Sequence, residues 1–286
     1  MPRSFVEQAC ARCSVPGSKL WFNCNPEGPE HWFYKSWVLK SKEMNALHIH
    51  FTMEDNLSLD RDIKARYERM YAGVFYDRYI LGKWVLAEGL VYPMFGPDNI
   101  TDEIPEHGDY YISCDYGTLN PFSAGLWCVT DKKAVRIREY YYSGRDSQAS
   151  KTDEEYYTEL EKLAGDLPIE NVIVDPSAAS FIETIRRHGR FSVRKAKNDV
   201  LPGIRMTATM IKAGIIQVNS CCKDEIREFG LYSWDDKATE DKPKKENDHA
   251  MDDTRYFCAT IMWRRRNMRR LIGGSPEDEE TENMAV

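Results

Sequence analysis

The stretch NDHAMDDTRY, residues 247–256, carries three aspartates and one histidine just before an apolar helical pattern. On a helix, Asp248, His249 and Asp252 are three or four residues apart and share one face. Asp253 points about 100° away from Asp252, which predicts that it faces solvent. An aspartate at the start of a helix serves as an N-cap, and we expect this role for Asp248. Asp252 has no capping role on that face and is a candidate metal ligand.

Two further aspartates stand where predicted strands end. Asp115 ends the run YYISCD, and Asp175 ends the short apolar run NVIVD. If these strands are neighbours, both carboxylates lie at one rim of the sheet, and a helix that crosses the rim adds a third. Carboxylates at close range repel one another unless a cation lies between them, and an oxygen-rich set suits Mg²⁺ or Mn²⁺ rather than Zn²⁺. We therefore expect a metal site formed by Asp115, Asp175 and Asp252.

The elements that would position these residues follow an α/β order. Three strand-like runs with short polar links are expected to be antiparallel, and later strands alternate with helices and are expected to be parallel. The predicted elements are strands at 110–117, 122–130 and 134–144, a helix at 153–163, a strand at 171–175, a helix at 176–189, a strand at 191–195, a helix at 201–212, an edge strand at 215–220 and a last helix from Asp248. The pattern predicts a mixed sheet flanked by helices.

The part before this domain is built differently. The acidic, Pro- and Gly-containing segment TDEIPEHGDY marks a boundary near residue 105. Ahead of it, Lys19–Phe22 is predicted as a strand, and 59–81 as helices interrupted by Gly73. One strand with helices forms no sheet to bury, so this part must pack on the second half or belong to something larger.

The net charge of −7 argues against a generally basic nucleic-acid binder, but cations gather locally. Each basic stretch is either a solvated helix face or a contact for phosphate. The polar loop 235–247, which we expect to be mobile, adds lysines. The two basic stretches consist of Arg186, Arg187, Arg190, Arg194, Lys195 and Lys197, and of Arg264, Arg265, Arg266, Arg269 and Arg270.

The sequence carries no signal for a membrane span, a signal peptide or a zinc site. No stretch approaches the roughly 20 apolar residues of a membrane span, and the N-terminus lacks the apolar region of a signal peptide, so we expect a cytoplasmic protein without a membrane partner. Among eight cysteines, Cys10 and Cys13 have CxxC spacing but no second pair. The sequence therefore favours reduced cysteines and no zinc site.

The acidic motifs resemble those of the ribonuclease H-like nuclease domain of tailed-phage terminase large subunits, the motor proteins of DNA packaging. CDYG at 114–117 is similar to the family's first acidic motif, VDPSAAS at 174–180 to its second, and DHAMDDTRY at 248–256 to its third, usually DHxxDAxRY. The resemblance implies that Asp115, Asp175 and Asp252 are metal ligands and that His249 is an auxiliary catalytic residue. Asp253 stands where alanine is common, which leaves Asp248 and Asp253 as secondary candidates.

The N-terminal part adds a second resemblance. WFNCNPEGPEHWFYK is similar to the end of the terminase ATPase core, where an asparagine-proline motif, here Asn25 and Pro26, couples hydrolysis to movement. YDRYILGKWVLAEGLVYPMF is similar to the connection from that core to the nuclease. Because no G-x-x-x-x-G-K-[ST] loop is present, we expect no ATP hydrolysis from this chain. The implied organisation is an ATPase remnant at 1–58, a linker region at 59–107, a ribonuclease H-like nuclease domain at 108–272 and a disordered acidic tail at 273–286.

The resemblance implies a two-metal-ion endonuclease that cuts concatemeric double-stranded DNA during packaging into proheads, with Mg²⁺ or Mn²⁺ as cofactors. Asp115 would bridge both ions, Asp175 and Asp252 would hold one each, and His249 would orient Asp252 or contact the scissile phosphate. The implied partners are phage DNA, the portal protein and the small terminase subunit. The implied location is the host cytoplasm, transiently at the prohead portal and not as a stable virion component. A ribonuclease H-like resolvase or transposase and an inactive, truncated prophage remnant remain as alternatives.

Overall fold

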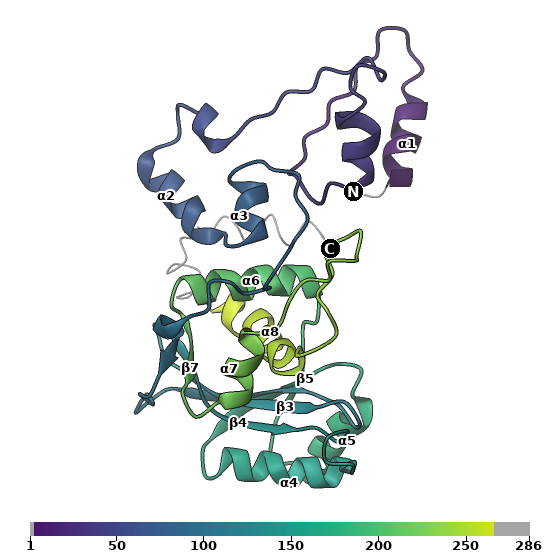
Figure 1. Cartoon of the computed structure of the whole chain (residues 1–286). Coiled ribbons are helices and arrows are strands. Elements are labelled where there is room, and N and C mark those ends of the chain that lie inside the picture. The colour runs from purple at the N-terminus through teal and green to yellow at the C-terminus, as the bar shows by residue number, and fades with distance from the viewer. Residues whose placement is uncertain (1–2, 266–286) are drawn as a thin grey trace.

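A seven-stranded sheet in the order β1-β7-β4-β3-β2-β5-β6 forms the centre of the computed structural model, which describes residues 3–265 (Figure 1). The strands β2, β3 and β4 are antiparallel, whereas β5, β6, β7 and β1 join the sheet in parallel pairings. This arrangement confirms the predicted mixed sheet. The strands are β1 (Ile100–Thr101), β2 (Asp109–Asp115), β3 (Phe122–Val129), β4 (Ala134–Tyr142), β5 (Ile169–Val174), β6 (Val193–Lys195) and β7 (Ile216–Asn219).

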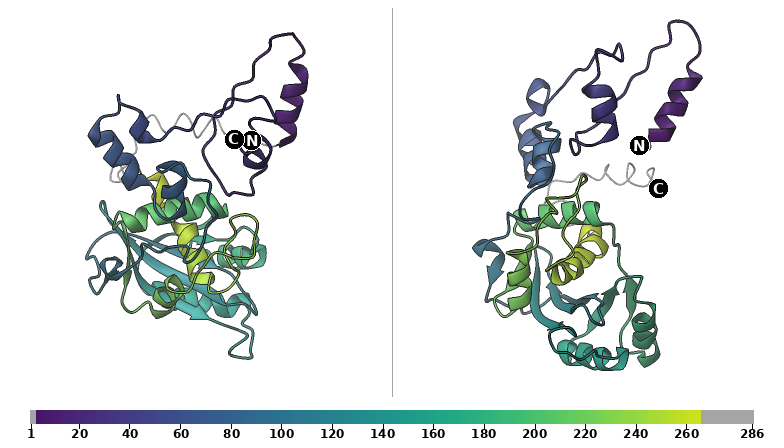
Figure 2. Two further views of the ribbon diagram at one scale, coloured as in Figure 1. Left: turned by 45° about the horizontal axis from the view of Figure 1, so that its top comes forward. Right: turned by 45° about the vertical axis from the view of Figure 1, so that its right-hand side comes forward.

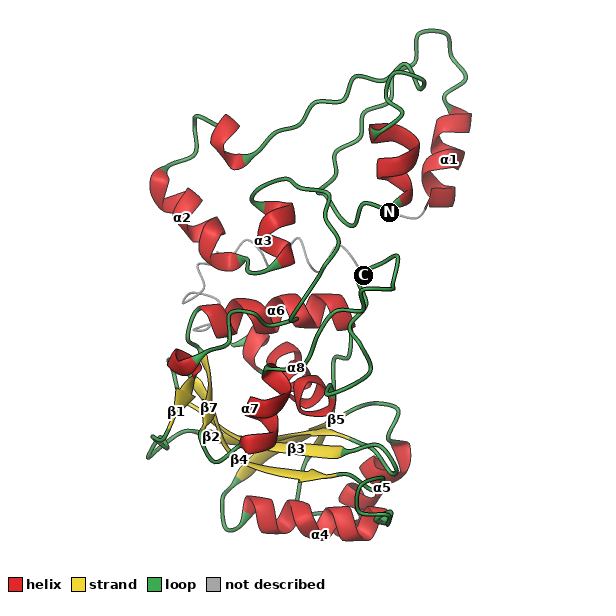
Figure 3. Ribbon diagram, in the orientation of Figure 1, coloured by secondary structure: helices red, strands yellow, loops and turns green. Residues whose placement is uncertain are grey.

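Helices cover both faces of the sheet (Figure 3). The helices α4 (Asp153–Ala164) and α5 (Ala179–His188) lie on one face, and α6 (Val200–Lys212), α7 (Lys223–Phe229) and α8 (His249–Thr260) lie on the other. Strand β3 is buried along its whole length because both of its faces are covered. Phe122 and Leu126 belong to the core on the α4 side, and Trp127 and Val129 to the core on the α8 side. This double burial explains why β3 is a continuous apolar run.

Two predicted element positions need correction. The strand expected at the edge of the sheet, β7, lies inside it, because Ile100 and Thr101 pair with Val218 and Asn219 on its outer side. The edge strand β1 thus comes from the segment predicted as linker. The helix expected from residue 176 begins three residues later, at Ala179.

The N-terminal arm contains only short helices (Figure 2). The predicted strand at Lys19–Phe22 is wrong: these residues have no regular structure, no strand among residues 3–265 pairs with them, and Trp21 is 84% exposed. Within residues 3–57, only Val6 is buried. The elements of this arm are α1 (Arg3–Arg12), a π-helical turn (Tyr34–Val38), a 3₁₀ turn (Met53–Asp55), α2 (Arg61–Met70) and α3 (Val74–Tyr79), and further 3₁₀ turns follow at Pro97–Asn99 and Met262–Arg264.

Helices α2 and α3 are separated at Gly73, as predicted, and lie against α6 (Figures 1 and 2). The polar loop 235–247 is attached to this region, because both carboxylate oxygens of Asp241 accept hydrogen bonds from the Arg78 guanidinium. None of the described helices is long and apolar enough to cross a membrane. Arg266, Arg269, Arg270 and the predicted acidic tail at 273–286 lie outside the described residues.

Candidate active site

Asp115 and Asp175 lie side by side at one rim of the sheet. Asp115 ends β2 and Asp175 directly follows β5; these strands are parallel, with Cys114 opposite Val174. The Tyr256 hydroxyl donates a hydrogen bond to Asp175 Oδ2 at 2.8 Å and lies 3.4 Å from Asp115 Oδ1. The structure therefore brings together the two carboxylates that the strand ends indicated.

Helix α8 crosses this rim and holds it at two points. His249, its first residue, places Nδ1 2.9 Å from Asp115 Oδ2, and Tyr256 lies two turns further along the same face. His249 therefore orients Asp115, whereas the sequence analysis expects it to orient Asp252 or to contact the scissile phosphate. Tyr256 was not predicted as a site residue. Its spacing of four residues after Asp252 was the available signal, because such residues share a helix face.

Asp252 lies on α8 between these two contacts, and it is 7% exposed. Arg255 Nε and Nη2 donate to its Oδ1 at 3.2 and 2.8 Å, and Lys245 Nζ lies 3.6 Å from its Oδ2. A Cβ atom on Gly203 of α6 would lie 2.7 Å from Arg255 Cγ, so a glycine is needed there for Arg255 to pass. Asp252 is thus close to the rim but is neutralised by two cations.

The N-terminus of α8 is capped by a residue other than the predicted one. Asp248 occupies the N-cap position, but its side chain accepts no capping hydrogen bond, and its backbone has φ −113° and ψ −7° instead of the extended conformation of capping residues. Glu228 of α7 takes over this role by accepting from the Ala250 N–H at 2.7 Å. The Asp248 carboxylate faces Lys245 Nζ at 3.4 Å instead. Capping from a neighbouring helix ties α7 to the site.

Asp253 does not face solvent, contrary to the prediction. It is fully buried and forms a bidentate ion pair with Arg136 of β4, with oxygen-to-nitrogen distances of 2.5 and 3.2 Å. Ser113 and Ser123 also donate hydrogen bonds to it. Asp253 therefore fixes α8 to the sheet from below and is not available as a ligand at the rim.

The electrostatics of the rim differ between its two carboxylates. Burial raises the pKa of Asp115 to about 6, against the hydrogen bond from His249, and the charge of Asp252 adds to the rise. Burial also acts on Asp175, but hydrogen bonds from Ser177 and Tyr256 outweigh it and lower its pKa. The pKa of His249 is raised, because its contact with Asp115 outweighs the opposing effect of burial. Burial of the Asp115 carboxylate thus disfavours its charged form, and a bound cation would favour it.

The donor set fits a hard divalent cation in chemistry, since carboxylate oxygens dominate it. In the present arrangement, no three His, Cys, Asp or Glu side chains of residues 3–265 converge closely enough to hold an ion. The oxygens of Asp252 contact Arg255 and Lys245. A site that includes all three aspartates requires Asp252 to exchange Lys245 for the ion.

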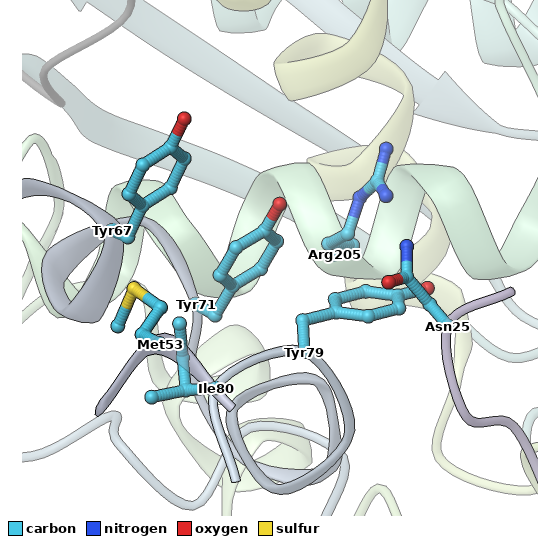
Figure 4. A pocket seen from close by; sticks show the side chains of 7 residues that line it. All are labelled: Asn25, Met53, Tyr67, Tyr71, Tyr79, Ile80 and Arg205. Carbon is cyan, nitrogen blue, oxygen red and sulfur yellow. The ribbon is translucent and has the colours of Figure 1, made fainter. Parts of the chain in front are cut away.

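The Asn25-Pro26 motif lies away from the carboxylates, in the N-terminal arm. Asn25 lines a cavity of about 250 Å³ that is enclosed by other parts of this arm, including α2 and α3, and by Arg205 of α6 (Figure 4). Rings of tyrosine residues from α2 and α3 form much of its wall (Figure 4). The other lining residues are Met53, Tyr67, Tyr71, Tyr79 and Ile80. The motif predicted to couple movement thus lies at the contact between the arm and the sheet domain.

The mixed sheet, with an acidic rim crossed by a helix, defines a ribonuclease H-like fold. This chain belongs to the phage terminase large subunit family. Residues 8–82 match the family model for the phage terminase large subunit. The chain is 54% identical to the large terminase from a thermophilic bacteriophage, solved in complex with ADP, over 92% of this chain and 67% of that one, with a TM-score of 0.84.

Two more distant relatives agree with this assignment. The terminase large subunit of Escherichia phage T5 is 23% identical over 263 residues, which are 86% of this chain; the chain spans 59% of that relative's length. The nuclease domain of the P22 large terminase shares the fold, with 20% identity, a TM-score of 0.51 and coverage of 64% of this chain and 97% of that domain.

Proposed function

We propose that this chain supplies the nuclease of a DNA-packaging terminase, a metal-dependent endonuclease that cuts concatemeric double-stranded DNA. The observation that carries the proposal is the paired rim of Asp115 and Asp175, held by His249 and Tyr256 of α8. Membership in the large terminase family supports it, because a nuclease domain of that family shares this fold.

The roles of the residues follow from their contacts. Asp115, Asp175 and Asp252 would hold Mg²⁺ or Mn²⁺, which in a two-metal site activates water and stabilises charge on the scissile phosphate. His249 and Tyr256 keep the Asp115 and Asp175 carboxylates in fixed orientations through hydrogen bonds. Arg255 holds one oxygen of Asp252 and leaves the other, beside Lys245, for exchange.

A plasmid-nicking assay with Mg²⁺ or Mn²⁺ tests this proposal. We expect Asp115→Asn, Asp175→Asn and Asp252→Asn each to abolish nicking, and chelation by EDTA to do the same. Asp131→Asn is the matched control, because Asp131 is exposed in the turn between β3 and β4. Undiminished cutting by all three rim variants would refute the assignment of the site.

The same assay distinguishes the alternatives. A ribonuclease H-like resolvase or transposase would prefer four-way junctions over linear duplex, whereas a packaging nuclease would cut linear duplex with little sequence preference. A truncated prophage remnant would fold normally and show no metal-dependent cutting. We propose duplex cutting, because the relatives matched over most of this chain are terminases.

The proposed partners beyond DNA are the portal protein and the small terminase subunit, met in the host cytoplasm and transiently at the prohead portal. The large terminase of the thermophilic bacteriophage was solved with ADP, but our proposal assigns no ATP hydrolysis to the present chain, since its sequence has no phosphate-binding loop. A phosphate-release assay with ATP and duplex DNA checks this expectation. Steady release of phosphate that survives purification on several columns would contradict it.

A further inference from the structure

Among residues 3–265, two cations contact the Asp252 carboxylate, and they differ in how firmly they are held. Arg255 is 2% exposed, and its Nε and Nη2 donate to Oδ1 of Asp252 at 3.2 and 2.8 Å. Its Nη1 also donates to the Asn198 carbonyl at 2.8 Å, which fixes the guanidinium. Lys245 Nζ lies 3.6 Å from the other oxygen, Oδ2, and 66% of the lysine side chain is exposed. Arg255 is thus a fixed partner of Asp252, whereas Lys245 is open to competition from solvent cations.

Lys245 is shared by two carboxylates. Its Nζ also lies 3.4 Å from Oδ2 of Asp248, a residue that is 4% exposed. Asp248 and Asp252 are four residues apart, so they lie one helical turn apart on one face. Lys245 and Arg255 supply two positive charges for these two negative ones, and His249, whose Nε2 lies 3.7 Å from Asp248, adds a third only when its ring is protonated. Removal of the Lys245 charge leaves this part of α8 more attractive to a cation.

The backbone on both sides of Lys245 is fixed. The Lys244 N–H donates to the Ser233 carbonyl at 2.9 Å, and the Asn247 side-chain oxygen accepts from Arg227 Nη1 at 3.1 Å. The lysine side chain itself is a flexible four-carbon stem. Lys245 can therefore leave and regain Asp252 by rotation of its own side chain, without movement of the loop.

A buried ion pair anchors the loop 235–247 further along. Asp241 and Arg78 have side chains that are 6% and 4% exposed, and the Arg78 guanidinium contacts both carboxylate oxygens of Asp241. Asp241 Oδ1 also accepts from the Ala87 N–H at 3.1 Å. Because removal of one partner from a buried pair is strongly destabilising, this anchor is firm. It keeps the loop, and with it Lys245, at the start of α8.

We propose that Lys245 is a displaceable internal counter-ion, which neutralises Asp252 until a divalent cation takes its place; this inference rests on the proposed nuclease function. Carboxylate oxygens are preferred ligands of hard divalent cations, so such an ion competes with an exposed ammonium group. Its apparent affinity is lowered by the fraction of molecules in which Lys245 occupies Asp252. Lys245 thus raises the ion concentration at which a site that includes Asp252 fills.

Isothermal titration calorimetry with Mn²⁺ in the absence of DNA tests the counter-ion without any cutting. We expect Lys245→Gln to bind Mn²⁺ about three- to fivefold more tightly than the wild type, since an exposed ion pair changes an equilibrium constant by up to about fivefold. Lys244→Gln is the matched control, because it removes the same charge from the next residue, whose Nζ lies 3.3 Å from Asp236. Lys244→Gln and the charge-preserving Lys245→Arg should not tighten Mn²⁺ binding.

Three results would overturn the proposal: an unchanged Mn²⁺ affinity of Lys245→Gln, equal tightening by Lys244→Gln, or no Mn²⁺ binding by either the wild type or Lys245→Gln. Matching thermal unfolding midpoints exclude misfolding, and Lys245→Met, which keeps the aliphatic stem, replaces Lys245→Gln if the midpoint of the latter is lower. Tighter Mn²⁺ binding by Lys245→Gln, together with no plasmid nicking by the wild type, supports the counter-ion and refutes the nuclease function. Nicking by the wild type with unchanged Mn²⁺ affinity of Lys245→Gln refutes the counter-ion alone.

Discussion

The buried cluster beneath α8 contains one guanidinium and three carboxyl groups, and this imbalance makes a sharp prediction. Arg136 pairs with Asp253, its Nε lies 2.5 Å from Glu225 Oε2, and its Nη2 lies 3.7 Å from Glu139. One guanidinium faces two fully buried carboxyl groups and the partly buried Glu139, so the cluster disfavours the simultaneous ionisation of all three. Burial raises the pKa of Glu225 well above its usual range; Arg136 opposes the rise and Asp253 adds to it.

Glu225→Gln and Asp253→Asn should therefore lower the free energy of unfolding by different amounts. Glu225→Gln removes a carboxyl group whose charged form is disfavoured by burial and keeps an acceptor for Arg136, so we expect a loss below about 1 kcal/mol in the free energy of unfolding. Asp253→Asn breaks a bidentate buried pair and leaves Arg136 without its main partner. We expect a loss of about 3 kcal/mol for it, at the lower end for such pairs because Glu225 and Glu139 still contact Arg136.

The pH dependence gives a second readout. Because the folded-state pKa of Glu225 is raised, folding takes up a proton, and this stabilising contribution is lost as pH rises above the unfolded value of about 4.3. Stability should fall by up to about 1.4 kcal/mol per pH unit through this window. Glu225→Gln should remove that part of the slope.

Urea unfolding followed by tryptophan fluorescence, at several pH values between about 5 and 8, measures both effects. Asp131→Asn again provides a control for an exposed aspartate. The reasoning is refuted if Glu225→Gln destabilises as much as Asp253→Asn, or if the slope with pH is the same in Glu225→Gln as in the wild type.

Three further predictions concern the contacts around α8. Tyr256→Phe should lower the nicking rate about 10-fold, because it removes the hydrogen bond to Asp175. Tyr232→Phe is the control and should leave the nicking rate unchanged, because the buried Tyr232 hydroxyl has no hydrogen-bond partner within residues 3–265. Equal nicking rates of the two variants would contradict this prediction. Glu228→Ala should reduce the free energy of unfolding by about 1–2 kcal/mol, because it removes the cap of α8. In the same urea experiment, Glu228→Gln should keep most of the wild-type free energy of unfolding, because its side-chain oxygen can still accept from the Ala250 N–H. A Gln variant as unstable as the Ala variant would argue against capping. Gly203→Ala should destabilise by about 1–3 kcal/mol, since its Cβ would overlap the Arg255 side chain, and a wild-type midpoint of thermal unfolding would disprove the overlap.

The sequence was a good guide where the signal was local. Asp115 and Asp175 follow apolar runs whose strand character is evident from a few residues, and parallel neighbours necessarily share a rim. The order of strands and helices after residue 108 was predictable for the same reason. The strand at Lys19–Phe22 failed, because apolar composition alone does not supply a neighbouring strand.

Prediction failed where a distant partner decides a side chain's surroundings. Helix periodicity places Asp253 away from Asp252 and therefore predicts that it faces solvent. In the structure, however, α8 is buried on every side from Ala250 to Thr260. The partner of Asp253, Arg136, lies 117 residues earlier, and no local pattern links the two. The capping of α8 likewise depends on Glu228 of another helix rather than on Asp248, its own N-cap residue.

The contact of His249 with Asp115 joins residues 134 positions apart in the chain, and this separation has a consequence for folding. We expect strands β2 and β5 to pair before α8 docks, because contacts between residues far apart in the chain form slowly. On this expectation, docking of α8 completes the acidic rim, and local opening of this helix would remove the contacts of His249 and Tyr256 with Asp115 and Asp175. Slow amide hydrogen exchange along α8 would then be the measure of how much of the protein is competent at any moment.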